Sequence, residues 1–359
     1  MNEQELYDKT VKCIRCGFCL EACPTFRLTG QETESPRGRI YLVRSAIEGQ
    51  LNWKDTTIHL DRCLGCRACE TACPSGVEYG DILEMAREKL EPQRPITQQL
   101  KRKLILKTIT TKLLNLIPIK KLPGLPPIPN KETKQTFPHH LNAGTKGEIN
   151  LLTGCVMDNL YHTTNQAARY LLEMQGYKVN ELKGICCKAL HKHVGIKQKQ
   201  PQFPPGTIAV TSAGCGSSLK DRGHNAKDIT ELITKTEPTT KTPITIVYQD
   251  ACHLLHGQKI AHQPRQLLDQ LPGVTRIEIE NAGDCCGSAG IYNITQPEMA
   301  KKLQQQKWQA IQKANPDLVV TANPGCLAWL TQAAEENKSP IPIIHIARFI
   351  AERCHNLQA

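Results

Sequence analysis

The feature that most constrains this chain is a pair of cysteine runs with one shared spacing. In each run three cysteines recur at every third position, and a fourth follows four residues later, directly before a proline. Thiolates are soft ligands that select iron–sulfur clusters or zinc. Eight thiolates at this spacing therefore predict metal binding in the first quarter of the chain. The runs are Cys13, Cys16, Cys19 and Cys23, and Cys63, Cys66, Cys69 and Cys73.

This spacing is that of bacterial-type ferredoxins with two [4Fe–4S] clusters, in which the fourth cysteine of each run binds the other cluster. We therefore predict two clusters and a role in moving single electrons. Zinc is the alternative, but zinc sites usually take two Cys-x-x-Cys pairs. The predicted ligands are Cys13, Cys16, Cys19 and Cys73 for cluster 1, and Cys63, Cys66, Cys69 and Cys23 for cluster 2.

The composition excludes several other classes of protein. Seventeen cysteines in 359 residues could suggest a disulfide framework, but such frameworks belong to small secreted domains. We see no signal peptide and no apolar stretch long enough to span a membrane, so we expect a cytoplasmic protein. Residues 91–150 carry an excess of eight positive charges out of the net +11. Because aromatic residues make up only 4%, we expect no nucleic-acid partner, but we do consider a peripheral contact with the inner face of the cell membrane.

The pattern of apolar residues divides the chain into four segments. We predict an α-helical ferredoxin at residues 1–92, a basic amphipathic and proline-rich connector at 93–148, and cysteine-rich repeats at 149–240 and 241–359. Ser35 and Pro36 form a favourable helix start within the first segment, and residues 81–90 read as another helix. In the connector, residues 104–122 are a candidate amphipathic helix, which would either lie on a membrane or brace the modules.

The last two segments repeat one pattern of short apolar runs and cysteines. Each half contains one cysteine, then a Cys-Cys pair, then another cysteine, and the single cysteines end β-rich runs. Ligands collect at the carboxyl ends of parallel strands, so we predict two pseudo-repeated α/β domains whose thiols converge. The second gap is twelve residues longer in the second half, which indicates an extra helix at residues 297–314.

The adjacent cysteines could bind an unusual iron–sulfur cluster or zinc, form a redox-active thiol pair, or be buried structural residues. We rank the second repeat above the first, because Gly287 eases the turn after the pair whereas Lys188 occupies that position in the first repeat. Nearby His191, His193 and His253 could bind metal or carry protons, but ordinary hydrogen-bonded histidines are expected more often. The possible sites are Cys252, Cys285, Cys286 and Cys326 in the second repeat, and Cys155, Cys186, Cys187 and Cys215 in the first; Cys354 is expected to be a plain helix cysteine.

These motifs together resemble those of the glycolate oxidase (glycolate dehydrogenase) iron–sulfur subunits. This family is related to the cysteine-rich subunits of heterodisulfide reductase and of anaerobic glycerol-3-phosphate dehydrogenase. The resemblance covers nearly the whole chain. It is carried by CIRCGFCLEACPT (13–25), ESPRGRI (34–40), CLGCRACETACPSGV (63–77), TSAGCG (211–216), DACHL (250–254), CCGSAGIY (285–292) and TANPGC (321–326).

The resemblance implies a partner subunit that contains FAD and oxidises a 2-hydroxy acid, while this chain relays the electrons to a membrane quinone or another acceptor. It also implies a non-cubane cluster at the second Cys-Cys motif. The isolated chain would not act on the hydroxy acid. Alternative functions are a heterodisulfide-type reductase subunit, a subunit of a glycerol-3-phosphate or lactate dehydrogenase, and a metal-stabilised assembly protein without turnover.

Overall fold

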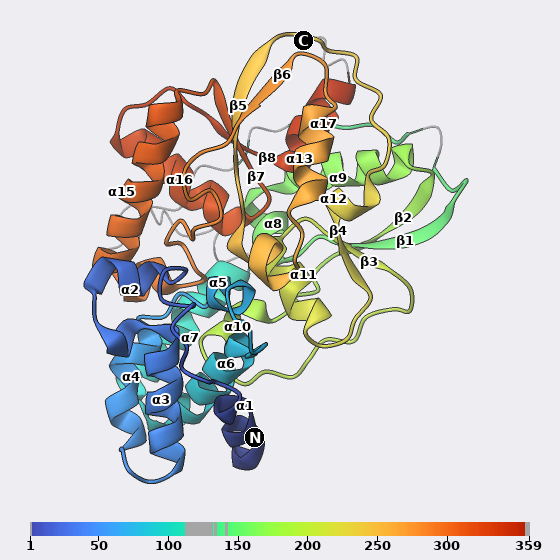
Figure 1. Cartoon of the computed structure of the whole chain (residues 1–359). Coiled ribbons are helices and arrows are strands. Elements are labelled where there is room, and N and C mark those ends of the chain that lie inside the picture. Colours follow the sequence, from blue (N-terminus) through green and yellow to red (C-terminus); the bar gives the residue numbers. More distant parts are fainter. Residues whose placement is uncertain (1, 112–131, 133–134, 141–142, 356–359) are drawn as a thin grey trace. The chain divides into compact units, whose positions relative to one another are not determined.

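The computed structural model describes residues 2–111, 132, 135–140 and 143–355 (Figure 1). The chain folds into two compact units, and each unit combines segments that are distant in sequence. Unit 1 contains residues 1–107, 188–199 and 284–303, whereas unit 2 contains residues 108–187, 200–283 and 304–359. The two short segments of unit 1 belong to the cysteine-rich half of the sequence, so the two units do not follow the order of the chain.

Unit 1 is helical, as the sequence predicts. Its helices α1, α3, α4 and α6 pack against one another around a core that includes Leu6, Ile40, Val43 and Leu60. These helices lie side by side in the lower part of Figure 1. The elements of its first 111 residues are α1 (Glu3–Val11), α2 (Pro24–Thr29), η1 (Glu32–Glu34), α3 (Pro36–Ile47), α4 (Trp53–Asp61), α5 (Ala68–Thr71), α6 (Tyr79–Leu90), η2 (Glu91–Gln93) and α7 (Ile96–Thr110).

Helix α3 begins where the sequence places it. The Ser35 side chain accepts a hydrogen bond from the N–H of Gly38, and Pro36 occupies the first helical position. The helix predicted at residues 81–90 is α6, which begins two residues earlier. In the connector, α7 begins at Ile96, before the predicted residue 104; residues 112–122 of that prediction and the proline cluster lie outside the described residues.

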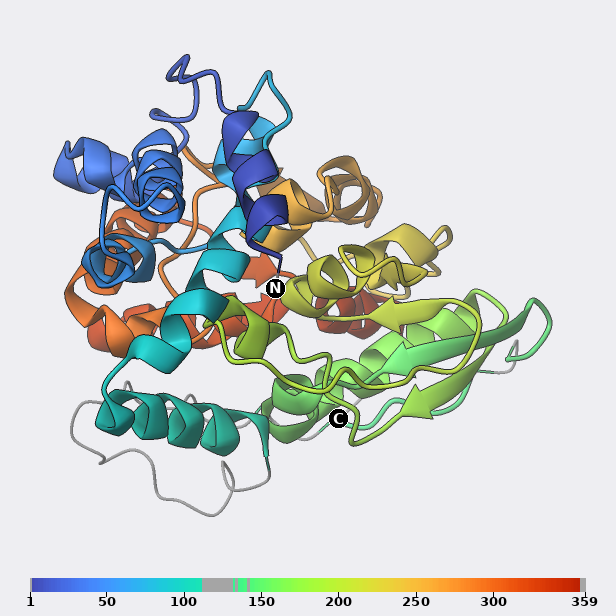
Figure 2. The same cartoon turned by 90° about the horizontal axis from the view of Figure 1, so that it is seen from below.

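Unit 2 contains two parallel four-stranded sheets with the same topology. The first has the strand order β2-β1-β3-β4 and the second the order β6-β5-β7-β8. This confirms two cysteine-rich α/β repeats with equivalent strands. The first sheet, drawn in green to yellow in Figures 1 and 2, comprises β1 (Gly147–Leu152), β2 (Tyr177–Leu182), β3 (Ile208–Val210) and β4 (Ala226–Asp228); the second comprises β5 (Ile244–Gln249), β6 (Val274–Ile277), β7 (Leu318–Thr321) and β8 (Ile343–His345).

The helices of the repeats connect these strands. Helix α9 packs on β2 and on α17, and α11 packs on the π-helix η5. Helix α15 occupies residues 297–314, as predicted, whereas the first repeat has only the short α10 at the corresponding point of the chain. The helices are α8 (Cys155–Leu160), α9 (His162–Met174), α10 (Ala189–His193), α11 (Ala213–Lys220), α12 (Ile229–Leu232), η5 (His253–Gly257), α13 (His262–Asp269), α14 (Tyr292–Thr295), α15 (Pro297–Ala314), α16 (Pro324–Glu336) and α17 (Ile346–Cys354).

Backbone hydrogen bonds join the two repeats inside unit 2 at equivalent positions. The Ala213 N–H donates to the carbonyl of Ala322 over 3.2 Å, and the Gly214 N–H donates to Asn323 Oδ1 over 3.3 Å. Both segments follow a central strand, one at the start of the cysteine-bearing helix α11 and the other directly before the cysteine-bearing helix α16. Within the described ranges, no helix combines the length and the apolar character needed to cross a bilayer.

Candidate iron–sulfur sites

Two pockets in unit 1 are lined by cysteines. The first pocket is partly open to solvent, has a volume of about 400 Å³, and is bordered by Cys13, Cys16, Cys19, Cys69 and Cys73. The second is also partly open, has a volume of about 300 Å³, and is bordered by Cys23, Cys63, Cys66 and Cys69. Cys73 of the second run therefore lies at the pocket of the first run, and Cys23 lies at the pocket of the second run.

The two cysteine runs share one backbone conformation although their residues differ. In the first run Arg15 and Gly17 have φ angles of +57° and +93°, and at the equivalent positions of the second run Gly65 and Arg67 have φ angles of +63° and +65°. Glycine adopts this left-handed region without strain. A Cβ on Gly65 would lie 2.7 Å from His193 Nε2, so this position also requires the absence of a side chain.

The donor atoms fit an iron–sulfur cluster. Burial raises the pKa of the Cys69 thiol well above its ordinary value, and the neighbouring Cys66 and Cys63 add to the shift. A buried thiolate therefore needs a compensating positive charge, which iron supplies. The Gly65 N–H donates to Cys63 Sγ over 3.4 Å, the Val77 N–H donates to Cys73 Sγ over 3.5 Å, and such bonds tune a cluster's potential.

The pockets differ in their exposure to solvent. Cys16 is exposed, and Ile14 and Phe18 between the ligands of the first run are 68% and 69% exposed. In contrast, Cys23, Cys63, Cys66 and Cys69 are all buried. The cysteines of the second pocket are thus less exposed to solvent than those of the first pocket.

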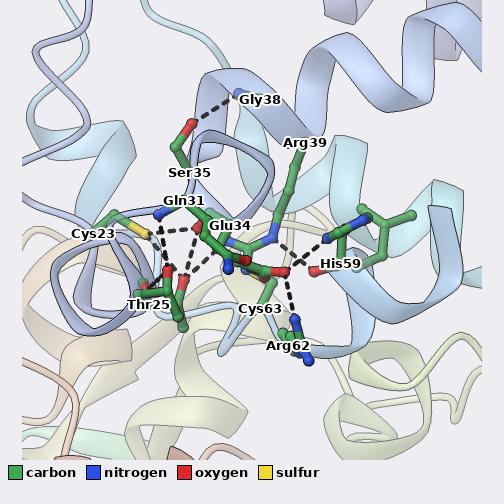
Figure 3. A network of polar contacts seen from close by, with 12 residues as sticks. Cys23, Thr25, Gln31, Glu34, Ser35, Gly38, Arg39, His59, Arg62 and Cys63 are labelled. Atoms are coloured by element: carbon green, nitrogen blue, oxygen red, sulfur yellow. Dashed lines mark hydrogen bonds and ion pairs between the residues drawn. The ribbon is translucent and has the colours of Figure 1, made fainter.

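A network of charged and polar side chains, drawn in Figure 3, reaches the second pocket through Arg39 and Thr25. Arg39 Nη2 donates to Glu34 Oε2 over 2.7 Å, and both side chains have almost no exposed surface. Arg39 Nη1 donates to Thr25 Oγ1 over 3.0 Å, and this hydroxyl lies 3.3 Å from Cys23 Sγ. The carboxylate that Arg39 binds is therefore a buried side chain of the same unit.

Sequence reasoning missed Glu34 and Tyr79 as neighbours of the ligands. The hydroxyl of Tyr79 donates to Cys63 Sγ over 3.5 Å, and Tyr79 lines both pockets. A signal was available, because a Glu-Ser-Pro-Arg-Gly-Arg segment places two arginines and an acid around one helix start. Nothing in the sequence, however, indicates which of the arginines faces inward.

The first-repeat cysteines come together in unit 2. Cys186 Sγ lies 3.5 Å from Cys155 Sγ, and Cys187 Sγ lies 2.9 Å from Cys215 Sγ. The hydrogen bond from Cys187 lowers the pKa of Cys215, and Ser212 and the Arg222 charge add to this effect. These four thiols, which we ranked below those of the second repeat, can therefore act on one ligand or on one another.

The second-repeat cysteines are divided between the two units. Cys252 and Cys326 belong to unit 2, where Cys252 Sγ lies 3.7 Å from His253 Nδ1. Cys285 and Cys286 are buried in unit 1, on a segment whose Tyr292 hydroxyl donates to the carbonyl of Arg62 over 3.1 Å. This segment therefore packs beside the second cysteine run.

The remaining residues singled out in the sequence have structural partners. His193 Nε2 lies 2.9 Å from the carbonyl of Leu64, between two predicted cluster ligands, and the His193 carbonyl accepts from Arg87 Nη1 over 2.7 Å. His191 lies on the same short helix α10. Cys354 is buried at the end of α17, and burial raises its pKa to about 11, as suits a helix cysteine without a ligand role.

Comparison with known proteins places both modules in families. Residues 12–77 match the family described as "4Fe-4S dicluster domain", and residues 149–203 and 246–331 match the "Cysteine-rich domain". The N-terminal module therefore binds two [4Fe–4S] clusters.

Relatives resemble the chain along nearly its whole length. It is 32% identical to the "Probable glycolate oxidase iron-sulfur subunit" of Bacillus subtilis, over 98% of this chain and 95% of that protein. It is 31% identical to the "Glycolate oxidase iron-sulfur subunit" of Escherichia coli, over 89% of both. A more distant relative, at 22% identity over 95% of this chain and 93% of that protein, is a subunit of the "Dihydromethanophenazine:CoB--CoM heterodisulfide reductase" of Methanosarcina barkeri.

Proposed function

The chain belongs to the family of glycolate oxidase iron–sulfur subunits, and from this premise we propose that it relays electrons within a dehydrogenase of glycolate-type 2-hydroxy acids. A partner subunit containing FAD would oxidise the hydroxy acid. Electrons would then pass singly through the two clusters of this chain to a membrane quinone or another acceptor. The observation that carries the proposal is the pair of thiol-lined pockets in the same unit, one with partly exposed cysteines and one with buried cysteines.

The proposed ligand assignment follows from those pockets. Cys13, Cys16, Cys19 and Cys73 would hold cluster 1, and Cys63, Cys66, Cys69 and Cys23 would hold cluster 2. When bound, the clusters supply one-electron chemistry. The protein's own residues bury the thiols of the second pocket and donate hydrogen bonds to Cys63 and Cys73, and the exposed Cys16 would leave cluster 1 accessible to a partner.

The assignment is tested by replacing Cys73 and Cys23, each of which lies at the pocket of the other run. They are replaced one at a time, and the protein is handled under strict exclusion of air. The unaltered chain should contain about eight irons and eight sulfides. Cys73→Ser should reduce the first cluster's EPR signal and Cys23→Ser the second's, whereas the control Cys354→Ser should keep both. A preparation that contains only zinc would contradict the proposal, and so would the loss of the same EPR signal in Cys73→Ser and Cys23→Ser.

A contact with the membrane surface is the second part of the proposal. Ile96, Leu100 and Leu104 are four residues apart on α7 and are 72%, 61% and 64% exposed, while Ile105 and Leu106 of the same helix are buried. Such a stripe, flanked by Lys101, Lys103 and Lys107, suits an anionic lipid surface.

Flotation with vesicles of phosphatidylcholine and phosphatidylglycerol tests this contact. Exchange of Ile96, Leu100 and Leu104 for serine should abolish flotation, whereas Ile58→Ser, at an exposed site on α4, should preserve it. Flotation that persists in the triple variant would exclude α7 as the contact.

A disulfide reductase remains the second candidate because of one observation, the 2.9 Å separation of Cys187 Sγ and Cys215 Sγ. A thiol pair this close can exchange with a substrate disulfide. The isolated chain with reduced viologen should then consume a mixed disulfide of two thiol cofactors, and Cys187→Ser should stop it. Absence of this reaction in a fully loaded protein would leave the electron-relay function alone.

A further inference from the structure

The buried guanidinium of Arg39 has a place in the molecule that its ion pair alone does not explain. Arg39 borders the second pocket together with Cys23, Cys63 and Cys66, whereas its partner Glu34 does not border that pocket. The Arg39 side chain is 1% exposed. The positive member of the pair therefore faces the thiols, and the negative member lies behind it.

The charges of this network do not cancel. Glu34 Oε2 accepts from Arg39, while its Oε1 accepts from Arg62 Nη1 over 3.0 Å and lies 2.7 Å from His59 Nδ1. Two guanidinium groups thus share one carboxylate, leaving a positive excess beside the cluster. An arginine guanidinium keeps its proton in proteins even when it is buried, so Arg39 is permanently charged.

The first pocket has an arginine of its own in a different setting. Arg37 borders the first pocket, pairs with Glu32 over 2.7 Å, and is 30% exposed, while Glu32 is 51% exposed. Water screens charges at the surface far more than charges in the interior. The two arginines, two residues apart on α3, therefore act on their pockets with unequal strength.

Reduction makes the charge in the interior important. A [4Fe–4S] cluster with four thiolates gains one negative charge when it accepts an electron, and a medium of low dielectric constant disfavours that gain. We propose that Arg39 offsets this penalty and keeps the buried second cluster reducible, so that an electron can enter the interior of the unit. One electron passes from the reduced flavin of the partner, or from dithionite in a test, to the cluster, and no bond is made or broken.

This inference rests on the proposed ligand assignment and deepens the proposed function. The test is a potentiometric titration of the intact chain, followed by EPR and visible absorbance, on variants with measured iron and sulfide. Arg39→Gln should move one of the two one-electron waves to lower potential, and Arg39→Lys, which keeps the charge, should restore most of the shift. The surface control Arg37→Gln should move the other wave by a smaller amount.

Glu34→Gln separates charge from structural damage. Removing the negative charge behind Arg39 should move the same wave to higher potential, opposite to Arg39→Gln, whereas a general loosening of the site would move both variants in one direction. If Arg39→Gln does not assemble the second cluster, the upward shift in Glu34→Gln and the retained potential of Arg39→Lys decide the question.

The outcomes that overturn the proposal are distinct. About eight irons with an unmoved wave in both Arg39→Gln and Glu34→Gln would exclude a role for Arg39 in the potential while leaving the ligand assignment intact. An unaltered chain without two clusters would instead defeat the assignment on which the proposal depends.

Discussion

The two cysteine-rich repeats have the same sheet topology but use different residues to cap the helix that follows the fourth strand. In each repeat the fourth strand ends at a buried residue that caps the next helix. Asp228 Oδ1 accepts from the Thr230 N–H over 3.0 Å, and His345 Nδ1 accepts from the Ala347 N–H over 3.1 Å. A carboxylate and an imidazole thus occupy equivalent caps, so the fold requires an acceptor there and not a particular charge.

Burial acts on these two caps in opposite directions. It raises the pKa of Asp228 to about 6 and lowers the pKa of His345 to about 4, because each neutral form is favoured away from water. His345 has a second task, since its Nε2 lies 2.7 Å from the carbonyl of Thr211 in the other repeat. The histidine therefore joins the two repeats as well as capping a helix.

The turns after the Cys-Cys pairs show the second difference. Lys188 and Gly287 occupy equivalent positions and have φ angles of +62° and +93°. A Cβ on Gly287 would lie 2.6 Å from the carbonyl oxygen of Ala300, in α15. The presence of α15 therefore requires a glycine at position 287. The first repeat has only α10 at this point and accepts a lysine.

The largest predicted effect is at the His345 cap, and the Asp228 cap serves as its comparison. His345→Asp retains an acceptor for the helix but places a carboxylate beside the Thr211 carbonyl and removes the donor, so we expect a loss of about 3–5 kcal/mol in the free energy of unfolding. Asp228→Asn keeps its cap and should cost less than about 1 kcal/mol. Denaturant unfolding measures both, and a His345→Asp variant as stable as Asp228→Asn would show that the second contact is unimportant.

The next prediction concerns the turns. Gly287→Ala should lower the free energy of unfolding by about 2–4 kcal/mol, because positive φ and the close carbonyl of Ala300 both oppose a side chain. Lys188→Gly relieves a strained φ in the native state but increases the conformational entropy of the unfolded chain. The two effects oppose each other, so the free energy of unfolding should change by less than about 1 kcal/mol. The same denaturation experiment checks both, and equal losses would mean that α15 does not impose the glycine.

The sequence predicts the repeats well and their differences poorly, for a physical reason. Apolar runs that end in cysteine identify β1, β3, β5 and β7, since each buried strand leaves a continuous apolar signal. Ser35 and Pro36 likewise identify the start of α3. The burial of Arg39, by contrast, depends on which side of a helix is enclosed by residues far along the chain, and no local pattern carries that information.

The candidate site was likewise predictable only in part. The cysteine spacing predicted that Cys73 lies with the first run and Cys23 with the second, because dicluster ferredoxins share this ligand spacing. Cys73 and Cys23 do line those pockets. The ranking of the two repeats rested on Lys188 and Gly287 and on the shorter segment after the first Cys-Cys pair. The structure shows that this difference follows the presence of α15, while the first-repeat thiols still converge.

A third prediction concerns the acid side of the stability profile. His345 is neutral in the native state, with a pKa near 4, and ordinary imidazole binds its proton near 6.5. The unfolded chain therefore binds more protons between these values, and native stability falls by about 1.4 kcal/mol for each pH unit below 6.5. Under anaerobic conditions, the advantage of the unaltered chain over His345→Asn should shrink by about that amount from pH 7.5 to 5.5. A constant advantage would contradict a neutral buried histidine.

The smallest predicted effect has the opposite sign and concerns Asp228. Its Oδ2 is buried and has no hydrogen-bond partner in the described part of the chain, and its native pKa of about 6 exceeds the unfolded value near 3.9. The native state thus binds more protons than the unfolded chain, so this group's contribution to stability is present at low pH and is lost as the pH rises through 6. Asp228→Asn should therefore gain about 0.8 kcal/mol relative to the unaltered chain from pH 5.5 to 7.5. In the comparison with His345→Asn, the pH dependence comes from a proton that the unaltered chain binds only when it is unfolded, so that slope has the opposite sign. Slopes of the same sign for the two variants would refute the view that burial neutralises both caps.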